Sequence, residues 1–206
     1  MSLATLRRLA RPLPAGTTRQ SEERCELCGV ALGAGHGHLV ALDQRVLRCA
    51  CRACYLLFTV EGAGRFRAVP ERYRFDPAHP MTEADWDELQ VPVTPAFFFT
   101  NSDLDRVVAC YPSPAGATEC LLDLAAWQRL RQCYPLLAAA AADVEALYVT
   151  RTQEGLEVFL IPIDACYAVV GQVRLAWRGL DGGAEVRRTL AAFVDDLRHR
   201  SRGVVT

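Results

Sequence analysis

Hydrophobic residues recur along the second half of the chain with two different periods. Short runs rich in aromatic and β-branched residues predict strands at 96–100, 106–111, 146–151 and 156–161. Apolar residues spaced three and four apart predict helices at 121–133, 164–177 and 184–200. Strands and helices do not alternate strictly, as they do in a doubly wound sheet. The pattern therefore predicts a mixed α+β domain over residues 63–206.

A more polar stretch opens this domain. Residues 65–75 alternate arginine with apolar side chains, which predicts an edge strand interrupted by Pro70. Thr82 is expected to cap a short helix that ends at Leu89, because acidic residues follow it in the first turn, where the helix dipole favours them.

The segment Tyr111–Glu119 contains two prolines, a glycine and three polar side chains. It is open to two interpretations, a small polar site made of Ser113, Thr118 and Glu119 or a rigid connection between a strand and a helix. The connection is favoured, because no histidine stands nearby in the sequence.

Little else in this domain points to catalysis. Cys166 lies on the apolar face of a predicted helix and is expected in the core, with Asp164 as the N-cap of that helix. No Ser-His-Asp or Cys-His pattern and no P-loop motif is present, so no catalytic residue is predicted.

The N-terminal part has a different pattern, in which two C-x-x-C motifs flank short strand candidates. Strands are predicted at 38–42 and 45–48 with a tight turn at Asp43-Gln44 between them. The apolar run at 55–60 predicts a further, buried strand. Together these features predict a metal-binding ribbon over residues 24–62.

The two motifs supply four thiols, which is the donor set of a tetrahedral structural zinc site. The predicted ligands are Cys25, Cys28, Cys51 and Cys54. Gly29 follows the first motif and is expected to adopt the positive φ that such a turn needs. In a chain without a secretion signal, paired C-x-x-C motifs indicate metal more often than disulfides. We expect one structural Zn²⁺, with Fe in a rubredoxin-like site as the alternative.

Three other side chains near the motifs are secondary ligand candidates. Cys49 precedes Cys51 by two residues, so it is a possible replacement for Cys51 or part of a second site. His36 and His38 are borderline ligands, but we interpret His38 as a loop imidazole hydrogen-bonded to the backbone and His36 as exposed. One closed site with four thiolates is favoured over two sites.

Charge and composition narrow the choice of partners. The net charge is −1 and the hydrophobic share is 51%, so the chain lacks the basic field that nucleic-acid binding requires. No apolar run is long enough to span a membrane. Residues 1–23 lack the apolar segment of a secretion signal and are interpreted as a flexible lead-in. The expected location is the cytoplasm.

Three stretches of the sequence are distinctive: CELCG…HGHL…LRCACRACYLLF, FFFTNS…VVACYPSPAGATECLL and FLIPIDACYAVVGQVRLAWRGLDGGAEV. They resemble an uncharacterised family of unknown function, met mainly in actinobacteria in gene neighbourhoods of NiFe hydrogenases. The similarity covers residues 24–198. The resemblance implies an accessory role with a hydrogenase subunit or maturation protein as partner, and it implies no catalytic residue.

Overall fold

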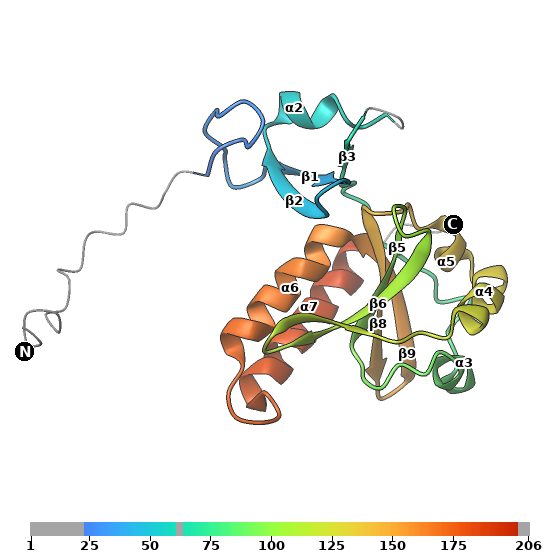
Figure 1. The fold of residues 1–206 in the computed structure, drawn as a ribbon. Coiled ribbons are helices and arrows are strands. Elements are labelled where there is room, and N and C mark those ends of the chain that lie inside the picture. Colours follow the sequence, from blue (N-terminus) through green and yellow to red (C-terminus); the bar gives the residue numbers. More distant parts are fainter. Residues whose placement is uncertain (1–22, 61–63, 202–206) are drawn as a thin grey trace, which may run out of the picture.

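The computed structural model describes residues 23–60 and 64–201 (Figure 1). All but the last residue of the predicted lead-in, 1–23, therefore lie outside the described residues. Within the described ranges, no helix is both long and apolar enough to cross a membrane.

The N-terminal part is a zinc-ribbon-like module built on a small antiparallel sheet. Its elements are β1 (Gly37–Ala41), β2 (Val46–Ala50), α2 (Arg52–Leu56) and β3 (Phe66–Ala68). The strand order is β2-β1-β3. The predicted hairpin is confirmed, and its register places Asp43-Gln44 at the centre of the turn. Because β3 pairs with β1, this sheet extends past residue 62. The domain boundary that the sequence predicts at residue 62 stays a prediction.

The strand predicted at 55–60 is wrong. The chain after Cys51 forms the short helix α2 and a following turn, in which Phe58 packs into the small apolar core of the ribbon. Tyr55 also packs against this core, whereas Leu56, Leu57 and Val60 are exposed, at 49%, 68% and 72%. A helical turn places residues three apart on one face. The spacing of Cys51 and Cys54 therefore agrees with a helix, although the residues that follow have high β-propensity.

The larger part is a six-stranded antiparallel sheet with helices on both faces, which confirms the α+β class (Figure 1). The strands, in the order β4-β9-β8-β5-β6-β7, are β4 (Arg74–Phe75), β5 (Ala96–Asn101), β6 (Arg106–Ser113), β7 (Gly116–Cys120), β8 (Glu145–Thr152) and β9 (Gly155–Pro162). The helices are α3 (Glu83–Glu88), α4 (Leu124–Cys133), α5 (Pro135–Ala139), α6 (Ile163–Ala176) and α7 (Gly183–Arg200).

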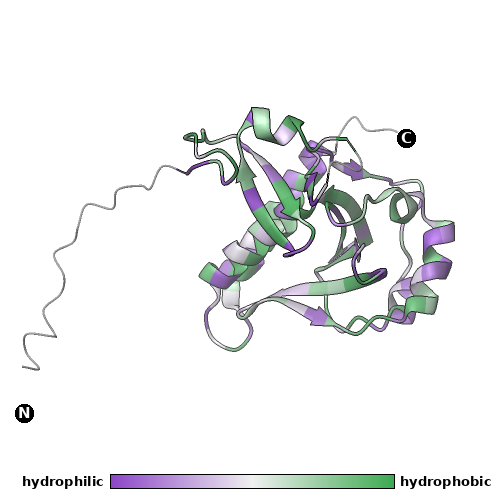
Figure 2. Cartoon of the chain, turned by 45° about the horizontal axis from the view of Figure 1, so that its top comes forward, coloured by the Kyte–Doolittle hydropathy of each residue, from purple (hydrophilic) through white to green (hydrophobic). Residues whose placement is uncertain are grey.

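Two apolar cores lie on opposite faces of this sheet. Successive side chains of a strand point to opposite faces, so Phe97 packs in the core beneath α6 and α7 while Phe98 packs against α3 and α4. This explains why the central strands read as continuous apolar runs instead of alternating ones. In Figure 2 the green hydrophobic colour accordingly runs through the middle of the domain.

The segment 65–75 is divided between the two sheets. Its first half forms β3 of the ribbon and its second half forms β4 of the large sheet, so the prediction of one interrupted edge strand is only partly right. The predicted cap is confirmed, because the Thr82 hydroxyl accepts a hydrogen bond from the Asp85 backbone N–H at 3.2 Å.

Two local predictions in the large domain are wrong. The segment Tyr111–Glu119 is not a connection between a strand and a helix. It forms the end of β6, a turn and most of β7, and Ser113 pairs with Gly116 next to the turn. The N-cap of α6 is Pro162, and Asp164 lies in the first turn of the helix. Cys166 is completely buried, as predicted.

The ribbon packs directly against the large domain. Val40 of β1 and Val69, just after β3, belong to the same apolar core as Ile163 at the start of α6. The Arg45 guanidinium of the ribbon also pairs with the Asp103 carboxylate of the large domain, at 2.6 Å. The metal-binding module is therefore held in a fixed position over the N-terminus of α6.

Candidate metal site

The first pair of cysteines lies in a tight turn. The Cys25 N–H donates to the Val30 carbonyl and the Gly29 N–H to the Cys25 carbonyl, both at 2.8 Å. Gly29 has a φ of +76°, so the left-handed conformation predicted for it is confirmed. Glycine adopts this conformation without the steric cost that a Cβ brings. The turn leaves the Cys25 side chain buried and the Cys28 side chain exposed.

The second pair stands at the start of α2. Strand β2 leads directly into Cys51, which is the N-cap residue of the helix, and Cys54 follows one turn later. The Tyr55 N–H donates to the Cys51 carbonyl at 2.8 Å, which closes this first turn. The hairpin thus carries the second pair back to the first.

The sulfur atoms of Cys25, Cys28, Cys51 and Cys54, the four-cysteine cluster, lie within 4.8 Å of one another. The Cys28 and Cys51 sulfurs are 3.7 Å apart. Four thiolates bound tetrahedrally to zinc at about 2.3 Å stand roughly 3.8 Å from each other. The four residues are all free cysteines. Their arrangement therefore fits a metal ion, and the four predicted ligands come together.

The cluster is unevenly charged without a cation. Burial raises the pKa of Cys25, but N–H groups of Cys51, Cys28 and Leu27 point at its sulfur and lower that pKa to about 6 overall. Hydrogen bonding with Cys28, together with desolvation, raises the pKa of Cys54 to about 12. One thiolate thus opposes ionisation of its neighbours. A bound divalent cation lets all four sulfurs carry charge together.

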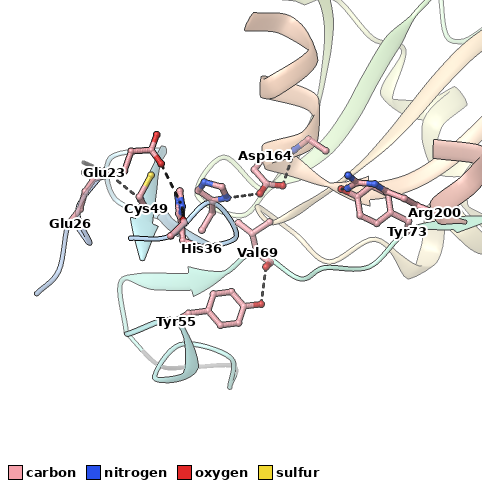
Figure 3. A network of polar contacts seen from close by, with 12 residues as sticks. Glu23, Glu26, His36, Cys49, Tyr55, Val69, Tyr73, Asp164 and Arg200 are labelled. Atoms are coloured by element: carbon pink, nitrogen blue, oxygen red, sulfur yellow. Dashed lines mark hydrogen bonds and ion pairs between the residues drawn. The ribbon is translucent and has the colours of Figure 1, made fainter. Parts of the chain in front are cut away.

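The secondary candidates do not join this cluster. The Cys49 sulfur instead lies within 4.8 Å of a ring nitrogen of His36 and of His38. His36 was expected to be exposed, but its side chain is only 10% exposed and its Nδ1 donates to the Gly33 carbonyl at 3.1 Å. His38 was expected to bond to backbone, but its Nδ1 donates to the Asp164 carboxylate at 2.7 Å. Figure 3 shows His36 and Cys49 on the ribbon beside Asp164 of the large domain.

Residues 24–201 match the model of a family described as a family of unknown function, DUF5947. The chain belongs to this family. The match covers the ribbon and nearly all of the large domain, in agreement with the extent of the resemblance. A comparison with curated proteins and one with solved structures found no match. The family description names no hydrogenase, so the link to hydrogenases stays a proposal.

One residue of this DUF5947 chain that positions the ligands was not predicted. The Glu26 N–H donates to the Cys49 carbonyl, and the Glu26 carboxylate accepts from the Cys49 N–H, both at 2.9 Å. The same carboxylate pairs with Arg48 at 2.6 Å. The Arg48 and Cys49 hydrogen bonds lower the pKa of Glu26. The position of Glu26 inside the first C-x-x-C motif was the only sequence feature that pointed to this role. That position does not predict the pairing of Glu26 with an arginine of β2.

Replacing Glu26 with alanine is expected to weaken metal binding at the four-cysteine cluster. The substitution removes two contacts that hold the first cysteine pair against β2, and loss of such an outer contact lowers metal affinity about 10–100-fold. Competition with a chromophoric chelator measures the affinity. Glu88→Ala, which removes the carboxylate partner of Arg129 at an exposed place outside the ribbon, is the control. Equal affinities of the two variants would contradict this role.

Proposed function

We propose that this protein is a zinc-binding accessory protein of NiFe-hydrogenase assembly or function. In this proposal the zinc ion is structural, and the ribbon contacts a hydrogenase subunit or a maturation protein. The observation that carries the proposal is a four-thiolate site beside an apolar outer surface. Four protein ligands fill the coordination sphere of tetrahedral zinc, whereas catalytic zinc sites keep one position for water or substrate.

The ribbon depends on a ligand for its stability. Among the described residues, the buried members of its own core cluster, apart from Cys25, are Leu39, Ala50 and Ala68. A core of this size buries little apolar surface, and modules of this kind are commonly stabilised by a structural metal. A structural role for the ion therefore agrees with the small core around it.

The outer surface of the ribbon offers a place for a partner. Helix α2 lies on the side of the ribbon that faces away from the large domain (Figure 1). The exposed apolar side chains there are Leu56, Leu57 and Val60. Apolar side chains that gather on an exposed surface often mark a protein interface. Arg45 and Arg48 are each paired with a carboxylate, which weakens the field that a nucleic acid requires.

Affinity purification from the native host tests the partner. We expect the tagged protein to retain a hydrogenase subunit or maturation protein, and Leu57→Glu to lose it while keeping its metal. Leu180→Glu is the matched control, because Leu180 is fully exposed in the turn between α6 and α7. Deleting the gene is expected to lower hydrogenase activity. Unchanged activity together with no hydrogenase-related partner would contradict the accessory function.

The alternative function is electron transfer by a rubredoxin-like iron site. The same four thiolates are a donor set for iron, and the exposure of Cys28 and the N–H groups directed at the Cys25 sulfur are features that would tune the reduction potential of such a site. Colour separates the two functions: protein from iron-replete cells is colourless if the ion is zinc, and red with thiolate-to-iron absorption bands if it is iron. A red protein would replace the structural-zinc proposal.

A further inference from the structure

A second group of metal-ligating side chains lies on the ribbon, next to the large domain. It is the His–His–Cys cluster, made of His36, His38 and Cys49, each of which offers one ligand atom within 4.8 Å of the others. His38 and Cys49 are directly paired across β1 and β2, and paired residues place their side chains on the same face of a sheet. The two imidazole rings meet edge to face with centroids 4.9 Å apart.

The ring of His36 has one nitrogen with no partner. Its Nδ1 carries the proton, because it donates to the Gly33 carbonyl. Its Nε2 is therefore a lone-pair acceptor, and this atom is buried and has no hydrogen-bond partner among the described residues. The whole side chain is nine-tenths buried. A buried acceptor without a donor is unfavourable, whereas a metal ion bound to the lone pair removes that cost.

The ring of His38 is oriented in the way that metal-binding histidines usually are. Its Nδ1–H is held by the Asp164 carboxylate, which fixes the tautomer and leaves Nε2 free. A carboxylate behind the other ring nitrogen is the common outer contact of a histidine bound to zinc. Asp164 belongs to α6 of the large domain, so the tertiary structure supplies this contact to the ribbon.

We propose that His36, His38 and Cys49 bind a second divalent transition-metal ion, in a site that is separate from the four-cysteine cluster. Two imidazoles and one thiolate are ligands that zinc and its neighbours in the first transition series accept. Three protein ligands leave a fourth position for an exchangeable ligand. His36 and His38 also line a polar cleft of about 340 Å³ between the two parts of the chain, which Arg200 reaches from α7. Two of the three ligand residues thus border a cleft that a small ligand could enter, whereas all four ligand positions at the four-cysteine site come from the protein.

Cobalt titration of the protein that already holds its first ion tests the second site alone. Under anaerobic, reducing conditions we expect one further equivalent of Co²⁺ to bind and to give tetrahedral absorption bands with a sulfur-to-cobalt transition. That transition should be weak, since a single thiolate contributes. Cys49→Ser and His36→Ala are expected to abolish binding of this equivalent while the first ion stays in place.

The controls separate loss of ligands from loss of structure. His79→Ala and Cys133→Ser remove the same side-chain types at exposed places outside the ribbon and should bind Co²⁺ as the native protein does. Asp164→Asn should weaken the site about 10–100-fold without abolishing it, as expected of a positioning residue. X-ray absorption of the native protein with zinc in the first site and cobalt in the second gives the cobalt ligands without any substitution.

Two results would overturn the proposal. One is native protein, with its first ion in place, that binds no further Co²⁺. The other is a further ion that the proposed residues do not bind. Its ligands would then lack imidazole nitrogen or sulfur, or Cys49→Ser would bind it as tightly as the native protein does. Each result leaves the structural role of the four-cysteine cluster unaffected, because the first ion stays bound throughout the measurement.

Discussion

Cys51→Ala is expected to release the metal ion from the four-cysteine cluster and to unfold the ribbon. A structural zinc ion contributes about 10–16 kcal/mol to the folding of zinc-finger peptides, and the apolar core of this ribbon is small. Loss of one of four ligands therefore removes most of the free energy that folds the module. Metal analysis should find that the four-cysteine cluster has lost its ion, and amide hydrogen exchange should show β1, β2 and β3 unprotected.

Cys51→Ala should destabilise the ribbon much more than the large domain. Val40 packs into the core beneath α6, so we expect the large domain to lose some stability but to stay folded. Cys133→Ala is the matched control, because Cys133 is an exposed cysteine on α4. If Cys51→Ala kept its metal and its thermal stability, the ligand assignment would be wrong.

Arg72→Met is expected to lower the free energy of unfolding of the large domain by about 3–5 kcal/mol. The Glu145 side chain is completely buried, and its two carboxylate oxygens accept from Arg72 Nε at 2.7 Å and from Arg72 Nη2. Apart from Arg72, the carboxylate accepts from the Ala141 N–H at 2.9 Å. Removing the guanidinium leaves a buried charge without a counter-ion, and this cost exceeds the value of the pair itself.

Urea unfolding of Arg72→Met measures this loss, which corresponds to a melting temperature lower by roughly 6–20 °C for a chain of this size. The matched control is Arg106→Ala, which breaks an ion pair with Glu119 whose two side chains are 46% and 52% exposed. Exposed pairs contribute about 0–1 kcal/mol. Similar losses in both variants would show that the Glu145 carboxylate is not held by Arg72 as described.

The sequence determined those features that depend on neighbours along the chain. The C-x-x-C spacing identified the four cysteines of the cluster, and Gly29 marked the turn that ends the first motif. Apolar periodicity located β5, β6, β8 and β9 and both long helices, because a strand or helix repeats its contacts at a fixed period. The turn at Asp43-Gln44 even fixed the register that pairs His38 with Cys49.

Local patterns were misleading where a distant contact decided the structure. Strand β7 was missed because its residues, GATEC, contain little apolar surface, and it forms by pairing with β6. The run at 55–60 has high β-propensity but forms the end of α2 and the turn after it, in which Leu57 is exposed. Intrinsic propensities are at most about 1 kcal/mol per residue, so tertiary contacts override them.

The two candidate metal sites also differ in how far the sequence alone predicts them. The four-cysteine cluster follows from two short motifs and a hairpin, so the sequence alone identified the four cysteines that come together. The His–His–Cys cluster was visible only as scattered secondary candidates, since its orientation depends on Asp164, which stands 126 residues after His38. Only the packing of α6 against the ribbon brings that carboxylate to the imidazole, because no pattern of neighbouring residues encodes a contact between elements so far apart in the chain.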